Sequence, residues 1–141
     1  MLKENVRILL VEDHPFQLIA TQVLLNNHGF YRLTPALTAS EAMLALERSA
    51  TPYDLLLCDQ GLPDVCGLDL IEQASRRGLI HQAVVFSGLA QSRLDDLQSQ
   101  AAERGLPLLG CLSKPLFAPD LARLLGHLGT EEGGPADQPT P

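Results

Sequence analysis

The chain has 141 residues, of which 45% are hydrophobic, and a mean hydropathy of +0.07, values that predict one globular domain with a sizeable core. Its formal net charge of −7 argues against direct binding to nucleic acid or to anionic lipid. No apolar stretch approaches the roughly 18 residues of a membrane-spanning helix, and the N-terminus lacks the apolar run of a signal peptide, so we expect a cytoplasmic protein.

The first predicted elements are a short aliphatic strand at residues 6–11 and a helix over about residues 15–27. Pro15 suits the first position of a helix, and Gly29 suits a left-handed cap after its end. The apolar residues of this helix recur at i, i+3, i+4, i+7 and i+8, a spacing that predicts one apolar face. The residues of that face are Phe16, Ile19, Ala20, Val23 and Leu24.

The second strand, about residues 31–33, is weak, and Pro35 limits it to the edge of a sheet or to a short piece. A helix is predicted after it because Thr38 and Glu41 stand three positions apart, the pattern of a capping box. The remaining strands are predicted at residues 55–58, 83–86 and 108–112. The remaining helices are predicted at about residues 68–77 and 92–104, and from Pro119 onward.

Strands and helices alternate five times, an order that predicts an α/β domain with a parallel sheet and helices on both of its faces. We place this domain at residues 5–128. The composition changes to Gly, Pro, Thr and acidic residues from Gly129, so residues 129–141 are predicted to be a disordered tail or a linker. The three cysteines show no metal-binding spacing and are expected to be free thiols.

Polar residues follow four of the predicted strands at the point where each strand ends. In chain order they are Glu12, Asp13, Asp59, Ser87 and Lys114. The carboxyl ends of parallel strands meet at one edge of a sheet, where α/β proteins bind ligands. Carboxylates that meet there need a counterion, and Mg²⁺ prefers a few carboxylates, a carbonyl and waters. An acidic nucleophile, a metal, a lysine and a hydroxyl together predict phosphoryl transfer to a carboxylate.

Each of these residues alone also has an ordinary explanation. The acidic pair could be a polar cap after a strand, and Asp59 could be a turn residue before Gly and Pro. Lys114 could belong to a surface loop. Their joint placement at the ends of different strands favours a shared site. His14, beside the acidic pair, is interpreted as the exposed start of a helix, with a metal ligand as the alternative.

Matching residues in chain order give the sequence a resemblance to the receiver domains of two-component response regulators. The matches are Val11-Glu12-Asp13, Asp59 with Pro63 and Gly67 downstream, Ser87-Gly88 and Lys114-Pro115. The resemblance covers about residues 5–128. It implies a flavodoxin-like (βα)5 fold, which is a doubly wound five-stranded parallel sheet. It also implies that Asp59 accepts a phosphoryl group from a histidine kinase or a phosphotransfer protein.

The resemblance further implies how the site is built. The residues implied to hold Mg²⁺ are Glu12, Asp13, Asp59 and, through its backbone carbonyl, Gly61. Ser87 and Lys114 are implied to bind the phosphoryl oxygens. Such a domain catalyses its own phosphorylation and slow dephosphorylation without being a metabolic enzyme, and its changed surface signals to an output domain or a partner protein.

Two departures from the receiver pattern concern the output side. Cys111 stands where receivers usually have an aromatic residue, three positions before the lysine. The spacing from Ser87 to Lys114 is several residues longer than in most receivers, and the excess lies within residues 89–109. This longer region resembles receivers that precede EAL-type cyclic-di-GMP phosphodiesterase domains, so cyclic-di-GMP signalling is one expected output.

Two other functions stay open at this point. Cys111 keeps open an interaction module that works on a receiver scaffold without phosphorylation. A phosphohydrolase of the haloacid dehalogenase type would need a second acid two positions after the nucleophile, where Gly61 stands, and is therefore less favoured. A homodimer is among the oligomeric states left open, and the sequence identifies neither the kinase nor the target.

Overall fold

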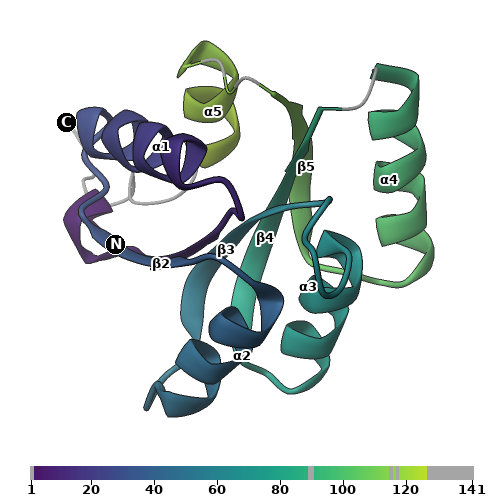
Figure 1. Ribbon diagram of the computed structural model, residues 1–141, viewed down its shortest axis with the longest axis horizontal. Coiled ribbons are helices and arrows are strands. Elements are labelled where there is room, and N and C mark those ends of the chain that lie inside the picture. The colour runs from purple at the N-terminus through teal and green to yellow at the C-terminus, as the bar shows by residue number, and fades with distance from the viewer. Residues whose placement is uncertain (1, 89–90, 115, 117, 127–141) are drawn as a thin grey trace, which may run out of the picture.

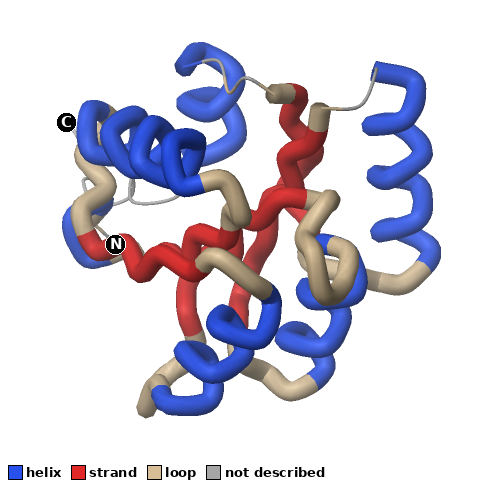
Figure 2. Tube along the Cα trace, in the orientation of Figure 1, coloured by secondary structure: helices blue, strands red, loops and turns tan. Residues whose placement is uncertain are grey.

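Five strands and five helices alternate in the part of the chain that the computed structural model describes, residues 2–88, 91–114, 116 and 118–126 (Figure 1, Figure 2). The strands are β1 (Arg7–Val11), β2 (Arg32–Ala36), β3 (Tyr53–Asp59), β4 (Ile80–Ser87) and β5 (Leu108–Ser113). The helices are α1 (Pro15–Asn27), α2 (Ala39–Arg48), α3 (Gly67–Arg76), α4 (Gln91–Glu103) and α5 (Ala118–Leu125), and a 3₁₀ helix, η1 (Lys3–Asn5), precedes β1. All strand pairs are parallel, in the order β2-β1-β3-β4-β5, so the predicted α/β fold is confirmed.

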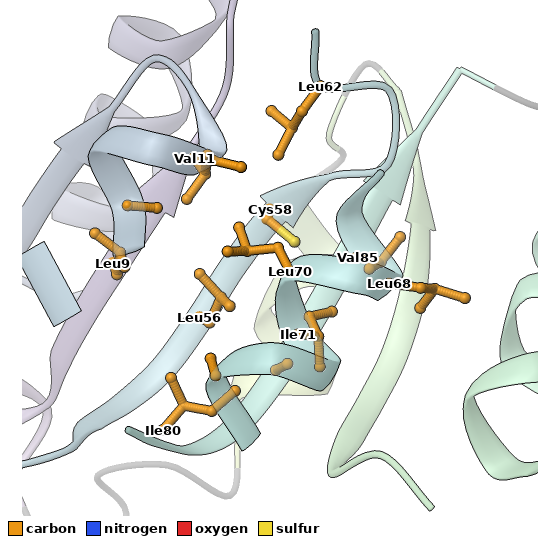
Figure 3. Packing of buried hydrophobic residues seen from close by; sticks show 14 of the residues in the cluster. Leu9, Val11, Leu56, Cys58, Leu62, Leu68, Leu70, Ile71, Ile80 and Val85 are labelled. Carbon is orange, nitrogen blue, oxygen red and sulfur yellow. The ribbon is translucent and has the colours of Figure 1, made fainter. Parts of the chain in front are cut away.

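The sheet is covered on both faces, and each face has its own hydrophobic core. Figure 1 shows α1 and α5 on one side of the sheet and α2, α3 and α4 on the other. Along β3, Leu55 and Leu57 belong to the core under α1 and α5, while Leu56 and Cys58 belong to the core of Figure 3. Each buried leucine of this kind contributes roughly 1.5–3 kcal/mol to folding. A strand buried on both faces therefore carries a continuous apolar run.

Helix α2 begins as the capping pattern predicts. The Thr38 hydroxyl accepts a hydrogen bond from the amide of Glu41 at 3.1 Å. The carboxylate of Asp64, from the loop between β3 and α3, accepts further hydrogen bonds from the amides of Ala39 at 3.0 Å and Ser40 at 2.9 Å. The first amides of a helix have no partner within the helix. Asp64 therefore both completes the start of α2 and joins α2 to the β3–α3 loop.

The apolar face predicted for α1 is wrong. Phe16 is 88% exposed, Ile19 57% and Val23 51%, and of the five predicted residues only Leu24 is partly buried. The residues that α1 buries are Leu18, Thr21 and Leu25. Apolar side chains lie around most of the circumference of this helix, so their spacing alone does not select one face. The exposed residues Phe16, Ile19 and Val23 form an apolar surface that we call the α1 stripe.

Strand β5 contains a β-bulge that accounts for one residue of the lengthened region. The pairing register shifts between Ala83 and Val84 of β4, so that Leu109 of β5 is extra. Beyond the bulge the pairing is regular as far as Ser87 and Ser113. A bulge bends and twists a strand locally and leaves the pairing on either side intact. The end of β5 therefore stays aligned with the end of β4.

Several smaller predictions can be compared with the structure. Gly29 ends α1 with φ of 91°, the left-handed conformation expected of it. Strand β2 lies at the edge of the sheet, as predicted, but it continues through Pro35. The tail at residues 129–141 and Pro115 fall outside the described residues. None of the helices in the described ranges is long and apolar enough to cross a membrane.

Candidate functional site

The carboxyl ends of four neighbouring strands bring the predicted site residues together. Glu12 follows β1, while Asp59 and Ser87 are the last residues of β3 and β4. Lys114 follows β5, and its backbone amide donates a hydrogen bond to the carbonyl oxygen of Ser87 at 2.8 Å. Because the strands are parallel and in register, these ends lie along one edge of the sheet.

Asp59 ends the central strand and is almost fully buried, with 4% of its surface exposed. Its two carboxylate oxygens have different partners. Oδ1 accepts a hydrogen bond from the amide of Gly61 at 3.1 Å, and Oδ2 accepts one from Lys114 Nζ at 2.9 Å. These contacts fix the orientation of the carboxylate at the sheet edge and place the amide of Gly61 beside it.

Lys114 is the cation at the centre of these residues. Its ammonium lies 2.9 Å from Asp59 Oδ2 and 3.0 Å from Glu12 Oε1, with 18% of the side chain exposed. It also lies 5.4 Å from the centre of the Phe86 ring, which permits a cation–π interaction. Burial alone would lower the pKa of Lys114, but the contacts with Asp59 and Glu12 outweigh burial and raise it above its usual value. The ammonium is therefore charged at neutral pH and bridges two carboxylates.

The acidic pair gives the site more negative than positive charge. Glu12 is fully buried, and Asp13 has 27% of its side chain exposed. Glu12 Oε1, which meets Lys114 as an ion pair, and Asp13 Oδ1 are both buried, yet neither accepts a well-aligned hydrogen bond from the described residues. Three carboxylates and one ammonium leave two negative charges, which one divalent cation would balance. Carboxylate oxygens with unused lone pairs are the ligands that Mg²⁺ prefers, so the residues present fit this ion.

The loop between β3 and α3, which carries Gly61, is held by contacts that the sequence did not reveal. A Cβ on Gly67 would lie 2.7 Å from the carbonyl oxygen of Asp59, so the close approach requires glycine. The side chain of Gln60 accepts a hydrogen bond from the amide of Leu68 at 3.0 Å and thereby caps α3. Residue spacing gave no sign of this cap, because its two groups meet only once the loop has folded.

Ser87 and Cys111 lie on the β4–β5 side of the site. Ser87 is buried at the end of β4, with 5% of its surface exposed. Cys111 is partly buried, on the face of β5 that packs toward α4. Burial, with a smaller contribution from the charge of Asp95, raises the pKa of the Cys111 thiol to about 11, so it is protonated at neutral pH. All three cysteines are free thiols, as predicted.

Residues 8–125 match the response regulator receiver domain family. The chain belongs to this family. The receiver domain is 35% identical over 127 residues to the sensor histidine kinase AruS of Pseudomonas aeruginosa, covering 89% of this chain and 12% of that protein. It is 28% identical over 121 residues to the cyclic di-GMP phosphodiesterase RocR of the same organism, covering 86% of this chain and 31% of that protein. It spans less than a third of the length of the curated relatives it matches.

Solved structures share the fold of this chain. A response regulator receiver domain protein from Clostridium thermocellum shares the fold with a TM-score of 0.72 at 20% sequence identity, covering 86% of this chain and 91% of that chain. The predicted flavodoxin-like receiver fold is thus confirmed. Receiver domains are signalling domains of two-component systems. Because the chain belongs to this family, the phosphohydrolase of the haloacid dehalogenase type is no longer a candidate.

Proposed function

We propose that this receiver domain accepts a phosphoryl group on Asp59 from a histidine kinase or a phosphotransfer protein and, with Mg²⁺ bound, signals through a changed surface. The observation that carries the proposal is the position of Asp59. It ends the central strand, is nearly buried, and is bonded to the only lysine at the sheet edge of the described chain, Lys114. The acidic pair, Glu12 and Asp13, lies with His14 in a group of possible metal ligands and would supply further oxygens that a divalent cation requires.

In the proposed transfer, a carboxylate oxygen of Asp59 attacks the phosphorus atom of the donor's phosphohistidine. A phosphorus–oxygen bond forms while the phosphorus–nitrogen bond breaks, and the freed imidazole takes a proton from solvent. Lys114 gives up its contact with the carboxylate and meets a phosphoryl oxygen as a point charge. Ser87 donates a hydrogen bond to another phosphoryl oxygen.

The residues proposed to hold Mg²⁺ are Glu12, Asp13, Asp59 and, through its carbonyl, Gly61. When bound, the ion would neutralise charge that develops on the phosphoryl oxygens. The support for this assignment is the surplus of negative charge and the unused lone pairs of the buried oxygens Glu12 Oε1 and Asp13 Oδ1.

The α1 stripe offers the proposed phosphodonor a surface close to the site. Phe16, Ile19 and Val23 are exposed along α1, which begins three residues after Glu12. A groove of about 310 Å³ continues the apolar surface toward β2, and its lining includes Pro15, Ile19, Pro35 and Leu37. Because apolar grooves beside helices accept the apolar face of an amphipathic helix, we propose that a helix of the phosphodonor binds here.

Labelling with acetyl phosphate tests the proposal. Wild-type protein with Mg²⁺ should gain a phosphoryl group in intact-protein mass spectrometry, should gain none with EDTA, and should gain none in Asp59→Asn. Asp96→Asn is the matched control, because Asp96 is an exposed aspartate within α4 and is not among the proposed site residues. Labelling of Asp59→Asn to the wild-type level would rule out Asp59 as the acceptor.

A second candidate function is an interaction module that needs no phosphorylation. Cys111 favours it, because a small, partly buried thiol cannot follow a movement of Ser87 in the way that an aromatic ring can. The labelling experiment separates the two candidates: a protein that gains no phosphoryl group from acetyl phosphate in the presence of Mg²⁺ would favour the module that needs no phosphorylation.

For the output, we propose a link to cyclic-di-GMP signalling. The support is the 28% identity to RocR, which is a cyclic di-GMP phosphodiesterase. Pull-down with immobilised receiver domain, with and without beryllofluoride, would test it. Capture of partners that carry no cyclic-di-GMP domain would argue for another output.

A further inference from the structure

His14 directs a ring nitrogen at the acidic pair of the site. Its Nδ1 atom lies 3.2 Å from Glu12 Oε2 and 3.2 Å from Asp13 Oδ1. His14 occupies the position before the first residue of α1, but its side chain makes no capping hydrogen bond with that helix. The ring orientation is therefore not explained by helix capping, and its contacts in the described chain are with the two carboxylates.

A proton on Nδ1 does not satisfy both of these carboxylates. One N–H group points at one acceptor, and the aligned contact of Nδ1 is the one to Glu12 Oε2. Asp13 Oδ1 is buried and accepts no well-aligned hydrogen bond from the described residues. A buried carboxylate oxygen left in this way is costly. A cation placed among the three atoms would satisfy all of them at once.

The spacing of the three atoms suits such a cation. Glu12, Asp13 and His14 each offer one ligand atom, and these atoms all lie within 4.8 Å of one another. Neighbouring ligands of a tetrahedral ion with bonds of about 2.1 Å lie about 3.4 Å apart. The two contacts of Nδ1, at 3.2 Å each, are close to that value. The Nδ1 atom is therefore positioned as a ligand beside each carboxylate.

We propose that His14 is a nitrogen ligand of this site and makes it accept an imidazole-preferring divalent metal, of which Zn²⁺ is the example, in competition with Mg²⁺. Imidazole suits Zn²⁺ and related ions, whereas Mg²⁺ takes oxygen ligands. The inference rests on the proposed function, because it concerns the metal site beside the same acceptor, Asp59. Its consequence is that the metal content of the site depends on the supply of both ions.

Two measurements on the full chain test this inference. Calorimetry gives the affinities for Zn²⁺ and Mg²⁺, and ¹⁵N NMR of the imidazole rings shows whether the His14 nitrogen moves when Zn²⁺ is added. Both use a Cys66→Ser background, because the partly exposed Cys66 thiol could bind Zn²⁺ itself. The variants are His14→Gln and, as the matched control, His81→Gln, an exposed histidine near the opposite end of β4.

In His14→Gln we expect the Zn²⁺ affinity to fall at least tenfold, because loss of a residue that only supports a metal ligand already costs roughly 10–100-fold. Its Mg²⁺ affinity should stay nearly unchanged, and the Zn²⁺-induced shift of one imidazole should disappear. His81→Gln should behave as the parent does. Unchanged Zn²⁺ affinity in His14→Gln, with Mg²⁺ binding and Asp59 labelling preserved, would overturn this inference alone. If the parent bound neither ion and did not label, the proposed function would fail with it.

Discussion

Replacing Lys114 with methionine should destabilise the receiver domain most strongly when no divalent cation is present. Lys114 places its ammonium 3.0 Å from Glu12 Oε1 and 2.9 Å from Asp59 Oδ2. Methionine keeps an unbranched apolar side chain of similar length and removes the charge. The buried carboxylates of Glu12 and Asp59, with Asp13 nearby, then face one another without a counterion.

The structure sets the size of the expected effect. Removing one partner of a buried ion pair costs about 3–5 kcal/mol, because the other charge stays buried and uncompensated. Since 18% of the Lys114 side chain is exposed, water already reaches the pair, and we expect the lower end, about 3 kcal/mol. A cation at 100 times its Kd stabilises a protein by about 2.7 kcal/mol. The variant should gain more than the wild type from Mg²⁺, because a competing positive charge is gone.

Urea denaturation followed by circular dichroism, in EDTA and in saturating Mg²⁺, measures both effects. Lys3→Met is the matched control, since Lys3 is the other lysine of the chain and lies 5.5 Å from the centre of the Phe30 ring, away from the acidic residues. It should lose little stability in either buffer. A loss below about 1 kcal/mol for Lys114→Met in EDTA, the range of an exposed ion pair, would refute the reasoning. Equal stabilisation of variant and wild type by Mg²⁺ would refute it as well.

Three further predictions concern the loop after β3 and the output side. Slight burial would raise the pKa of Asp64, but its hydrogen bonds to the start of α2 outweigh burial and lower it. Asp64→Asn should therefore cost about 1 kcal/mol at neutral pH. That difference should be complete above the unfolded pKa of about 3.9 and vanish as the pH falls through the lower folded value, whereas a pH-independent difference in urea titrations would contradict it. Gly67→Ala should cost about 1–3 kcal/mol in urea denaturation, because its Cβ would meet the Asp59 carbonyl at 2.7 Å, while Gly88→Ala, with nothing within 4 Å, should be nearly neutral; equal losses would disprove the steric argument. Cys111→Ala should leave the beryllofluoride-dependent change in hydrogen exchange across α4 intact, and an α4 that does not respond in the wild type would show that the signal leaves elsewhere.

Much of the fold and of the candidate site could be predicted because both depend on where apolar runs stop. The run before Asp59 is continuous because β3 is buried on both faces, and the first polar residue marks the sheet edge. The same holds for Glu12 after β1 and Ser87 at the end of β4. Parallel pairing then brings residues that are far apart in the chain to one place.

What the sequence did not predict depends on contacts between surfaces rather than on local pattern. The buried face of α1 could not be identified, because Phe16 and Leu18 are equally apolar and only packing against the sheet distinguishes them. In the sequence, Asp64 and Gln60 look like ordinary loop residues. Only the folded β3–α3 loop places the carboxylate of Asp64 at the start of α2 and the side-chain oxygen of Gln60 at the start of α3. The contact of His14 with the acidic pair likewise appears only in three dimensions.

The bulge at Leu109 lets β5 contain one residue more than the paired part of β4. Because pairing resumes after it, the amide of Lys114 bonds the carbonyl oxygen of Ser87 although β5 carries one extra residue. We therefore expect that a change in the length of the segment between Gly88 and the bulge would leave Lys114 in its position beside Ser87. Insertions in this segment would change the surface of the domain around α4, while the residues of the candidate site stay where they are.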